Sequence, residues 1–224
     1  MSIAENLSHF NSKLAPFNAK LVAVSKTKPN EDLLQAYDAG QRDLGENKVQ
    51  ELVGKFETLP KDIRWHMIGH LQRNKVKYIA PFVHLIHAVD STRLLKEIDK
   101  QGEKNGRVIE CLLQIFIAKE ESKFGLDDHE LYELLGSDEF AEMNHIKVVG
   151  LMGMATNTDN EAQVRSEFKG LKELFEKVKA KFQSEKVEMK ELSMGMTGDY
   201  QIALEEGSTM VRIGSAIFGE RNYH

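Results

Sequence analysis

The sequence has 224 residues, of which 41% are hydrophobic and 29% are charged, and its formal net charge is −5. This length and composition are those of a soluble globular protein with one sizeable core. Acidic and basic residues are mixed along the chain, so no basic stripe indicates nucleic acid as a partner. The apolar runs are too short to span a membrane.

The N-terminal residues lack both the basic region and the apolar region of a secretory signal. Cys111 is the only cysteine, which excludes an internal disulfide and fits a reducing compartment. We therefore expect a cytoplasmic protein, in which Cys111 is a buried packing thiol rather than a nucleophile. No long exposed apolar edge argues against a monomer, which is the state that we expect.

Short apolar runs rich in β-branched residues alternate with longer amphipathic runs along the chain. This alternation is typical of βα units around a parallel sheet. The runs with strand character are LVAVSK from Leu21, DLGEN from Asp43, RWHMIG from Arg64, LIHAVDS from Leu85, VIECLLQIF from Val108, KVVGLMGM from Lys147, ELSMG from Glu191 and MVRIGS from Met210.

Helix signals fill the intervals between these runs. Three helices are predicted after Pro29, Ser91 and Asp127, and they end near Gly40, Gly102 and Gly136. The longest helical run, 160–186, has an apolar stripe with Lys and Glu between its members. This pattern indicates an outer helix with a solvated face rather than a partner-binding coiled coil. A leading helix, 2–14, precedes the first strand.

Eight strands that alternate with helices in 224 residues favour a compact (β/α)8 TIM barrel with an extra N-terminal helix. The competing fold, an open doubly wound sheet, usually has a glycine-rich turn after its first strand. Here the first strand runs into SKTKPN, which contains no glycine. Only AIFGERNYH follows the last strand run, so we expect residues 1–224 to form a single domain.

Functional groups of such a barrel lie at the C-terminal ends of its strands. Lys26 ends the first strand and shares a face with Val22 and Val24, because side chains alternate along a strand. If this face points inward, burial disfavours the charged ammonium and leaves more free amine to attack a carbonyl. The alternative is a lysine that reaches solvent at the end of its strand.

Two turns after the last strands offer an anion site. SMGMTGD begins at Ser193 and RIGS begins at Arg212, and both supply backbone N–H groups, hydroxyls and glycines. Neighbouring loops after strands seven and eight commonly bind phosphate in these barrels. Because barrel closure places strand eight beside strand one, the two turns and Lys26 together predict a carbonyl compound that carries a phosphate.

Arg212 adds a clue about the electronic state of that compound. As an inward residue of the last strand, it can face the ring of a bound cofactor. A guanidinium only donates hydrogen bonds, so it keeps a ring nitrogen unprotonated and makes the ring a poor electron sink. The alternative is a structural ion pair with Glu205 or Glu206.

These residues belong to a set of ordered motifs, which are AVSKTKP (23–29), LGENKVQE (44–51), WHMIGHLQRNK (65–75), VDS (89–91), EESKFG (120–125), GLMGM (150–154), LSMGMTGDY (192–200) and EEGSTMVRIGSAIFG (205–219). Through them, nearly the whole chain resembles the pyridoxal phosphate homeostasis proteins, also called the alanine racemase N-terminal-domain-like family. The resemblance implies a fold-type III barrel with pyridoxal 5′-phosphate (PLP) bound as a Schiff base on Lys26.

The resemblance also implies roles for other residues. Arg212 would face the pyridine nitrogen, and the phosphate would be contacted by Ser193, Gly214 and Ser215. Asn47 would lie beside the cofactor, with His66 and Met194 as further neighbours. The chain departs from the family at Phe116, where QIF replaces the frequent Gln-Val-Asn. A polar contact from the end of strand five is therefore in doubt.

Members of this family are described as lacking a clear catalytic activity and as affecting vitamin B6 balance. True racemases of this fold add a second domain that supplies an opposing tyrosine, and a lone barrel lacks that second base. We therefore expect a non-enzymatic PLP carrier that serves intracellular PLP homeostasis and delivers the cofactor to PLP-dependent apoenzymes. A weak amino-acid racemase is the alternative, and a Schiff-base aldolase is a third that leaves Arg212 unexplained.

Overall fold

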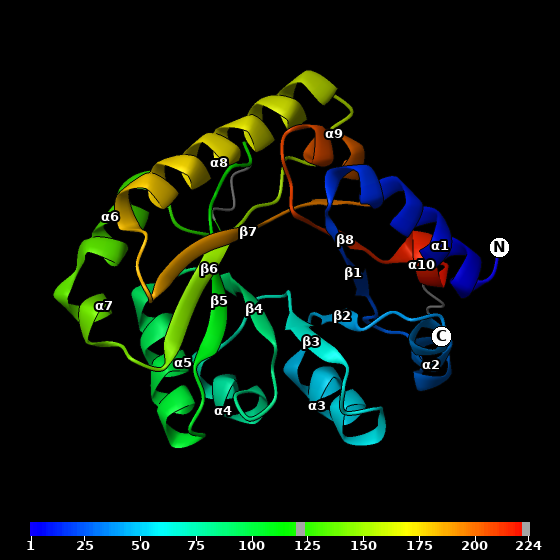
Figure 1. Ribbon diagram of the computed structural model, residues 1–224, viewed down its shortest axis with the longest axis horizontal. Coiled ribbons are helices and arrows are strands. Elements are labelled where there is room, and N and C mark those ends of the chain that lie inside the picture. Colours follow the sequence, from blue (N-terminus) through cyan, green and yellow to red (C-terminus); the bar gives the residue numbers. More distant parts are fainter. Residues whose placement is uncertain (120–123, 221–224) are drawn as a thin grey trace.

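The computed structural model describes residues 1–119 and 124–220. Its centre is a closed barrel of parallel strands, in which each strand pairs with the next in chain order and the last pairs with the first (Figure 1). The strands are β1 (Lys20–Val24), β2 (Asp43–Glu46), β3 (Arg64–Met67), β4 (Leu85–Val89), β5 (Ile109–Gln114), β6 (Ile146–Met152), β7 (Val187–Met196) and β8 (Met210–Ile213). The predicted strand runs and the (β/α)8 barrel are confirmed.

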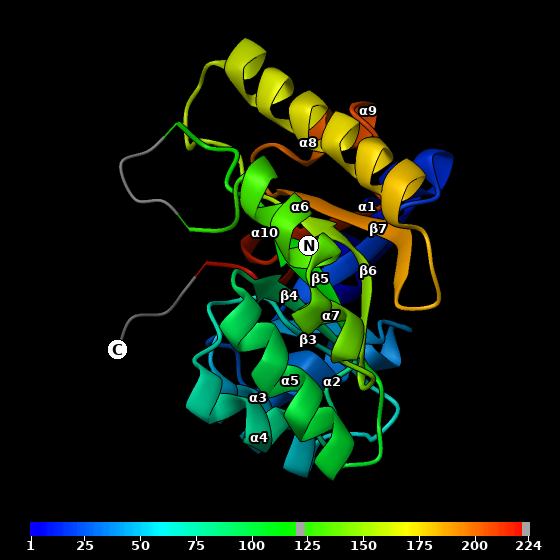
Figure 2. The same cartoon turned by 90° about the vertical axis from the view of Figure 1, so that its left-hand side faces the viewer.

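Helices cover the outside of this barrel, and α8 lies along β7 in both views (Figures 1 and 2). The helices are α1 (Ile3–Leu14), α2 (Asn30–Asp38), α3 (Val49–Thr58), α4 (Val76–Ile79), α5 (Thr92–Lys104), α6 (Asp128–Gly136), α7 (Asp138–Glu142), α8 (Glu161–Phe182), α9 (Tyr200–Glu205) and α10 (Ser215–Phe218), with 3-10 turns η1 (Ala15–Phe17) and η2 (Arg73–Lys75). The predicted helices correspond to α1, α2, α5, α6 and α8. No helix among the described residues is both long and apolar enough to cross a bilayer.

Side chains at the helix starts explain where the predicted helices begin. Ser2 and Asp127 form capping boxes at α1 and α6, each with the glutamate three residues later. Ser91 at α5 and Asn160 at α8 each accept a hydrogen bond from a first-turn N–H group. These caps satisfy backbone donors that a helix leaves unpaired at its N-terminus.

The leading helix α1 covers a part of the outer barrel surface that the last helix, α10, is too short to cover. Helix α10 is a single turn, and α1 packs against it, against α2 and along β1. The buried face of α1 consists of Leu7, Phe10 and Leu14. Burial of this face shields the outer side of the barrel near β1, where one turn of helix leaves apolar surface uncovered.

The barrel has an inner and an outer core. Val22 belongs to the inner core, together with Leu85, Ala88, Leu112, Val149, Met152 and Met210. Leu21 and Ala23 belong to the outer core between strands and helices, as strand alternation predicts. Cys111 is fully buried in the outer core, where burial raises the pKa of its thiol, so its predicted packing role is confirmed.

A buried ion-pair network lies next to the turn that carries Lys26. The Lys55 ammonium of α3 donates to the Ser25 carbonyl oxygen at 2.7 Å, to Glu46 Oε1 at 2.8 Å and to Glu51 Oε1 at 2.7 Å. The Ser25 hydroxyl donates to the same Glu46 oxygen at 2.5 Å. Because Glu46 is fully buried, desolvation raises the pKa of its carboxyl, against the opposing effect of Lys55.

The same network holds Thr27 in an uncommon conformation. Thr27 has φ of 64°, a left-handed value that is a true outlier for a β-branched residue. Its backbone N–H donates to Glu51 Oε1 at 2.5 Å. Strained residues of this kind persist where the surroundings determine them, and they concentrate at functional sites. The network thus fixes the path of the chain immediately after Lys26.

Replacing Lys55 by methionine should lower the free energy of unfolding by about 3–5 kcal/mol, because it leaves the buried Glu46 without its cation. Lys96→Met is the matched control, since Lys96 pairs with Glu139 on the exposed surface, and such pairs contribute at most about 1 kcal/mol. Urea unfolding measures both variants. Equal stability of the two variants would contradict a structural role for the network.

Candidate cofactor-binding site

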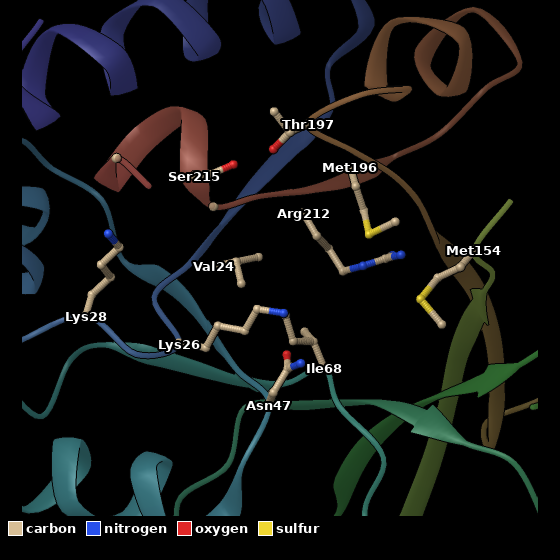
Figure 3. Close-up of a pocket in the computed structure, with 12 residues that line it drawn as sticks. Val24, Lys26, Lys28, Asn47, Ile68, Met154, Met196, Thr197, Arg212 and Ser215 are labelled. Atoms are coloured by element: carbon tan, nitrogen blue, oxygen red, sulfur yellow. The ribbon is translucent and has the colours of Figure 1, made fainter. Parts of the chain in front are cut away.

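A cavity of about 240 Å³ opens at the C-terminal ends of the barrel strands (Figure 3). Functional groups of (β/α)8 barrels lie at this end. The walls come from the ends of β1, β2, β3, β6, β7 and β8 and from the first turn of α10. The lining residues are Val24, Lys26, Lys28, Asn47, Ile68, Met154, Met196, Thr197, Arg212, Gly214, Ser215 and Gly219.

Five of the predicted site residues line this cavity, namely Lys26, Asn47, Arg212, Gly214 and Ser215. They follow or end strands that are far apart in sequence but adjacent in the closed barrel, where β1 pairs with both β2 and β8. Figure 3 shows the half-buried Lys26 amine and the Arg212 guanidinium extending into the same space from neighbouring strands.

Three predicted site residues lie outside the cavity. Met194 is fully buried in the outer core, so its side chain points away from the barrel interior. Ser193 is fully buried inside the barrel, where its hydroxyl is hydrogen-bonded to Arg212 and His87. His66 also lies in the barrel interior, bonded to Asp43 at the start of β2. None of these three residues lines the cavity, and their contact with the cofactor stays a prediction.

A bulge in β7 determines which residues at the end of this strand reach the cavity. Ser193 pairs with Met210, but Met196 pairs with Arg212, so one extra residue is inserted in β7. Gly195 lies within the bulge and has φ of 97°, and a Cβ atom on it would be 2.6 Å from the Ala203 Cβ. The bulge brings Met196 and its neighbour Thr197 to the cavity. The glycine within a strand was the available signal.

The cavity combines apolar walls with polar groups at its ends. Val24, Ile68, Met154 and Met196 supply apolar surface, and of these the sequence reasoning had missed Ile68 as a lining residue. Thr197 and Ser215 supply hydroxyls on the same side of the view in Figure 3. The first turn of a helix also presents N–H groups that lack intrahelical partners. This arrangement suits a flat ligand that carries an anionic group at one end.

Arg212 is the buried cation of this site, with 4% of its surface exposed. Its guanidinium donates to Ser193 Oγ at 2.6 Å and to the Gly153 carbonyl oxygen at 3.2 Å. Burial lowers the pKa of Arg212 to about 10, although the charge of Asp199 acts in the opposite direction. The group therefore stays protonated at neutral pH and acts as a hydrogen-bond donor.

The alternative role of Arg212, an ion pair with Glu205 or Glu206, is excluded. Arg165 of α8 holds both carboxylates on the surface, with N–O distances of 2.6 Å to Glu205 and 2.7 Å to Glu206. The buried position of Arg212 is thus set by the barrel interior and not by its neighbours in sequence.

The segment after β5 contributes little to this cavity. Phe116, the position at which the chain departs from the family motif, lines a neighbouring cavity that shares Met154 and Met196 with the first. Residues 120–123 of the EESKFG motif lie outside the described residues. The described part of this segment therefore borders the first cavity only at Met154 and Met196, which line both cavities.

Comparison with known proteins places the chain in a family. Residues 1–222 match the family model for the alanine racemase N-terminal domain. The chain is 41% identical over 206 residues to the pyridoxal phosphate homeostasis protein of Aquifex aeolicus, which covers 92% of this chain and 88% of that protein. It is also 41% identical over 207 residues to that of Haemophilus influenzae, covering 91% and 86% of the two chains.

Solved structures agree with the sequence matches. PipY of Synechococcus elongatus, solved without PLP, is similar with a TM-score of 0.90 and 33% identity over 97% of this chain and all of that chain, and the form with PLP bound gives 0.85. Alanine racemase of Bartonella henselae, at 17% identity and a TM-score of 0.72, shares the fold over 60% of its own length. The chain therefore belongs to the alanine racemase N-terminal domain family and, within it, to the pyridoxal phosphate homeostasis proteins.

Proposed function

We propose that this protein binds PLP in the cavity at the C-terminal end of the barrel and holds it as a Schiff base on Lys26, for intracellular PLP homeostasis. The observation that carries the proposal is the convergence of Lys26, Arg212 and the Gly214–Ser215 turn on one cavity. The names of the relatives and the PLP-bound form of PipY support it. The proposal includes a single domain over residues 1–224, a monomer and a cytoplasmic location.

Each side of the cavity fits one part of PLP. The Lys26 amine can condense with the aldehyde, forming a carbon–nitrogen double bond while the aldehyde oxygen leaves as water. The walls of Val24, Ile68 and Met196 suit the faces of the ring. Arg212 can donate to the ring nitrogen, and Asn47 is the amide nearest the Lys26 side of the cavity.

The opposite end of the cavity fits the phosphate. Thr197 and Ser215 offer hydroxyls, and the chain at Gly214 and Ser215 offers backbone N–H groups. Gly214 packs closely on β1, because a Cβ atom there would lie 3.1 Å from the Val24 carbonyl oxygen. This close approach keeps the phosphate end within reach of the strand that carries Lys26. Thr197 belongs to the SMGMTGD turn, which the sequence predicted as part of the anion site.

Arg212 favours a carrier over an enzyme. PLP enzymes that form carbanions use the ring as an electron sink, and that sink is strongest when the ring nitrogen is protonated. A donor-only guanidinium in this position leaves the nitrogen unprotonated. The protein then holds the cofactor without activating it strongly, and it can pass PLP to PLP-dependent apoenzymes. The second candidate function is a weak amino-acid racemase, which Lys26 favours as an available base.

Borohydride reduction of the protein–PLP complex should fix the cofactor on Lys26, as peptide mapping can establish. Lys26→Ala should weaken PLP binding at least about tenfold, because the covalent anchor is lost. Lys61→Ala is the control, since Lys61 is an exposed lysine bonded to backbone carbonyls of α3. A wild-type label on Lys28, the other lysine that lines the cavity, would show that the anchor is assigned to the wrong residue.

Pyridoxal without its phosphate should bind far more weakly than PLP. Charge-assisted hydrogen bonds contribute about 1.5–3 kcal/mol each, and the Thr197 and Ser215 side of the cavity can supply several. Calorimetric titration with both ligands measures the difference. The double variant Thr197→Ala and Ser215→Ala should reduce that difference. If the wild-type protein bound both ligands with equal affinity, the Thr197 and Ser215 side of the cavity would not be the phosphate site.

The protein should catalyse alanine racemisation or transamination more slowly than about 1 s⁻¹, the low end for ordinary enzymes. The reason is the donor-only contact of Arg212, which gives little stabilisation to a carbanion. The PLP-loaded protein should at the same time transfer its cofactor to an apoenzyme, measured by recovery of that enzyme's activity. Steady turnover above this limit with a common amino acid would favour the racemase.

A further inference from the structure

The positive charge of Arg212 has no acidic neighbour in hydrogen-bond contact within residues 1–119 and 124–220. Its guanidinium is bonded to the Ser193 hydroxyl and the Gly153 carbonyl oxygen, which are both neutral. A buried charge without a partner is strongly unfavourable. The charge of Asp199 acts against burial on the pKa of Arg212, but it makes no hydrogen bond to the guanidinium, so the bonds to Ser193 and Gly153 determine how that group is held.

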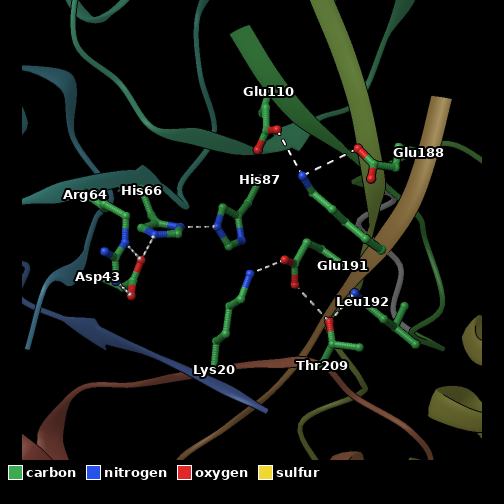
Figure 4. Close-up of polar contacts among 11 residues, drawn as sticks. Lys20, Asp43, Arg64, His66, His87, Glu110, Glu188, Glu191, Leu192 and Thr209 are labelled. Carbon is green, nitrogen blue, oxygen red and sulfur yellow. Dashed lines mark hydrogen bonds and ion pairs between the residues drawn. The ribbon is translucent and has the colours of Figure 1, made fainter. Parts of the chain in front are cut away.

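Those hydrogen bonds continue through the inside of the barrel. Ser193 Oγ lies 3.0 Å from His87 Nδ1, His87 Nε2 lies 2.9 Å from His66 Nδ1, and His66 Nε2 lies 2.9 Å from Asp43 Oδ1. Figure 4 shows the part formed by His87, His66 and Asp43. Ser193, His87 and His66 are all at most 1% exposed. The chain of contacts runs from the cavity to the start of β2, at the other end of the barrel.

One direction of the hydrogen bonds satisfies both ends of this path when the two imidazole rings are neutral. Arg212 can only donate, so the Ser193 oxygen accepts from it, and the Ser193 hydroxyl proton is available for His87 Nδ1. His87 then carries its proton on Nε2 and donates to His66 Nδ1. His66 in turn carries its proton on Nε2 and donates to Asp43, whose carboxylate can only accept.

Charges along this path agree with that direction. Burial acts to raise the pKa of Asp43, but hydrogen bonds from Arg64 and His66 outweigh it and hold the pKa well below its usual range. Burial also lowers the pKa of His87 far below its ordinary value, so the ring is neutral. The path thus has a cation at one end, an anion at the other and the neutral His87 ring between them, an arrangement in which successive hydrogen bonds polarise one another.

We infer that Asp43, His66, His87 and Ser193 form a directed hydrogen-bond chain that positions the Arg212 guanidinium at the ring end of the cavity. This inference rests on the proposed binding of PLP. The chain does not deliver protons to the cavity, because a guanidinium keeps its protons. Ser193 is the direct positioning residue, and the histidines act through it.

The test compares two buried serines. Ser193→Ala breaks the chain next to Arg212, whereas Ser208→Ala removes a hydroxyl that is bonded only to the backbone carbonyls of Leu192, Met194 and Met210. Ser193→Ala should weaken PLP binding about tenfold, the value of one modest hydrogen bond to a charged group, and should change the absorbance spectrum of bound PLP. Ser208→Ala should do neither. The same affinity and spectrum for both variants would overturn the inference.

A second measurement needs no cofactor. Nitrogen-15 NMR of the apoprotein reports which ring nitrogen of each histidine carries the proton. His66 and His87 should both carry a proton on Nε2 and none on Nδ1. Ser193→Ala should change the His87 signals and leave those of the exposed His129 unchanged. A proton on Nδ1 of His87 would overturn the chain. If the wild-type protein binds no PLP, the proposed function is wrong. The tautomers of His66 and His87 then still show whether the hydrogen-bond chain runs in the inferred direction.

Discussion

The pairing of β1 with β8 is the contact on which the site depends. It places Val22 beside Arg212 and Ala23 beside Ile213, which are separated by most of the chain. Lys26 continues from the first strand and Gly214 from the last, so one seam brings an amine and an anion-binding turn together. Gly214 is needed there, since a side chain would press on Val24. An open sheet with the same strands would separate the two groups by its full width.

Two buried cations, Lys55 and Arg212, lie beside this seam. Apolar residues of similar size often replace buried ion pairs without loss of stability. Lys55 and Arg212 are nevertheless both buried, and each is held by several hydrogen bonds. Lys55 fixes the turn after Lys26, and Arg212 faces the cavity. Their hydrogen bonds thus hold groups on two sides of the cavity.

The sequence predicted the elements of the barrel better than their details. Strand alternation correctly placed Val22 inside and Leu21 outside, and helix caps correctly placed the starts of α5 and α6. The start of β7 at Val187 was missed, because Glu188 and Lys190 between its buried residues obscure the apolar run. Short helices such as α10 were missed because one turn has no periodicity to detect.

The sequence could predict those site residues whose positions are set by the strand that carries them. Lys26 and Asn47 closely follow β1 and β2, Arg212 lies near the end of β8, and all three line the cavity. Met196 and Thr197 reach the cavity beyond the bulge at Gly195, which shifts the alternation of side chains by one residue. The polar contacts of Arg212 come from β7 and the end of β6, and long-range contacts of this kind leave no pattern in a single sequence.

Strand β2 links both sides of the site, although it has only four residues. Its first residue, Asp43, points into the barrel and bonds to His66, while its last, Glu46, is bonded to Lys55 of the outer helix α3. These two acids face opposite ways because they are three positions apart in the strand, an odd offset. Gly45 leaves room inside, where a Cβ atom would lie 2.9 Å from Val22. One short strand therefore supplies the anion for the Lys26 turn and the anion for the Arg212 chain, so a shift of β2 by one residue would disturb both.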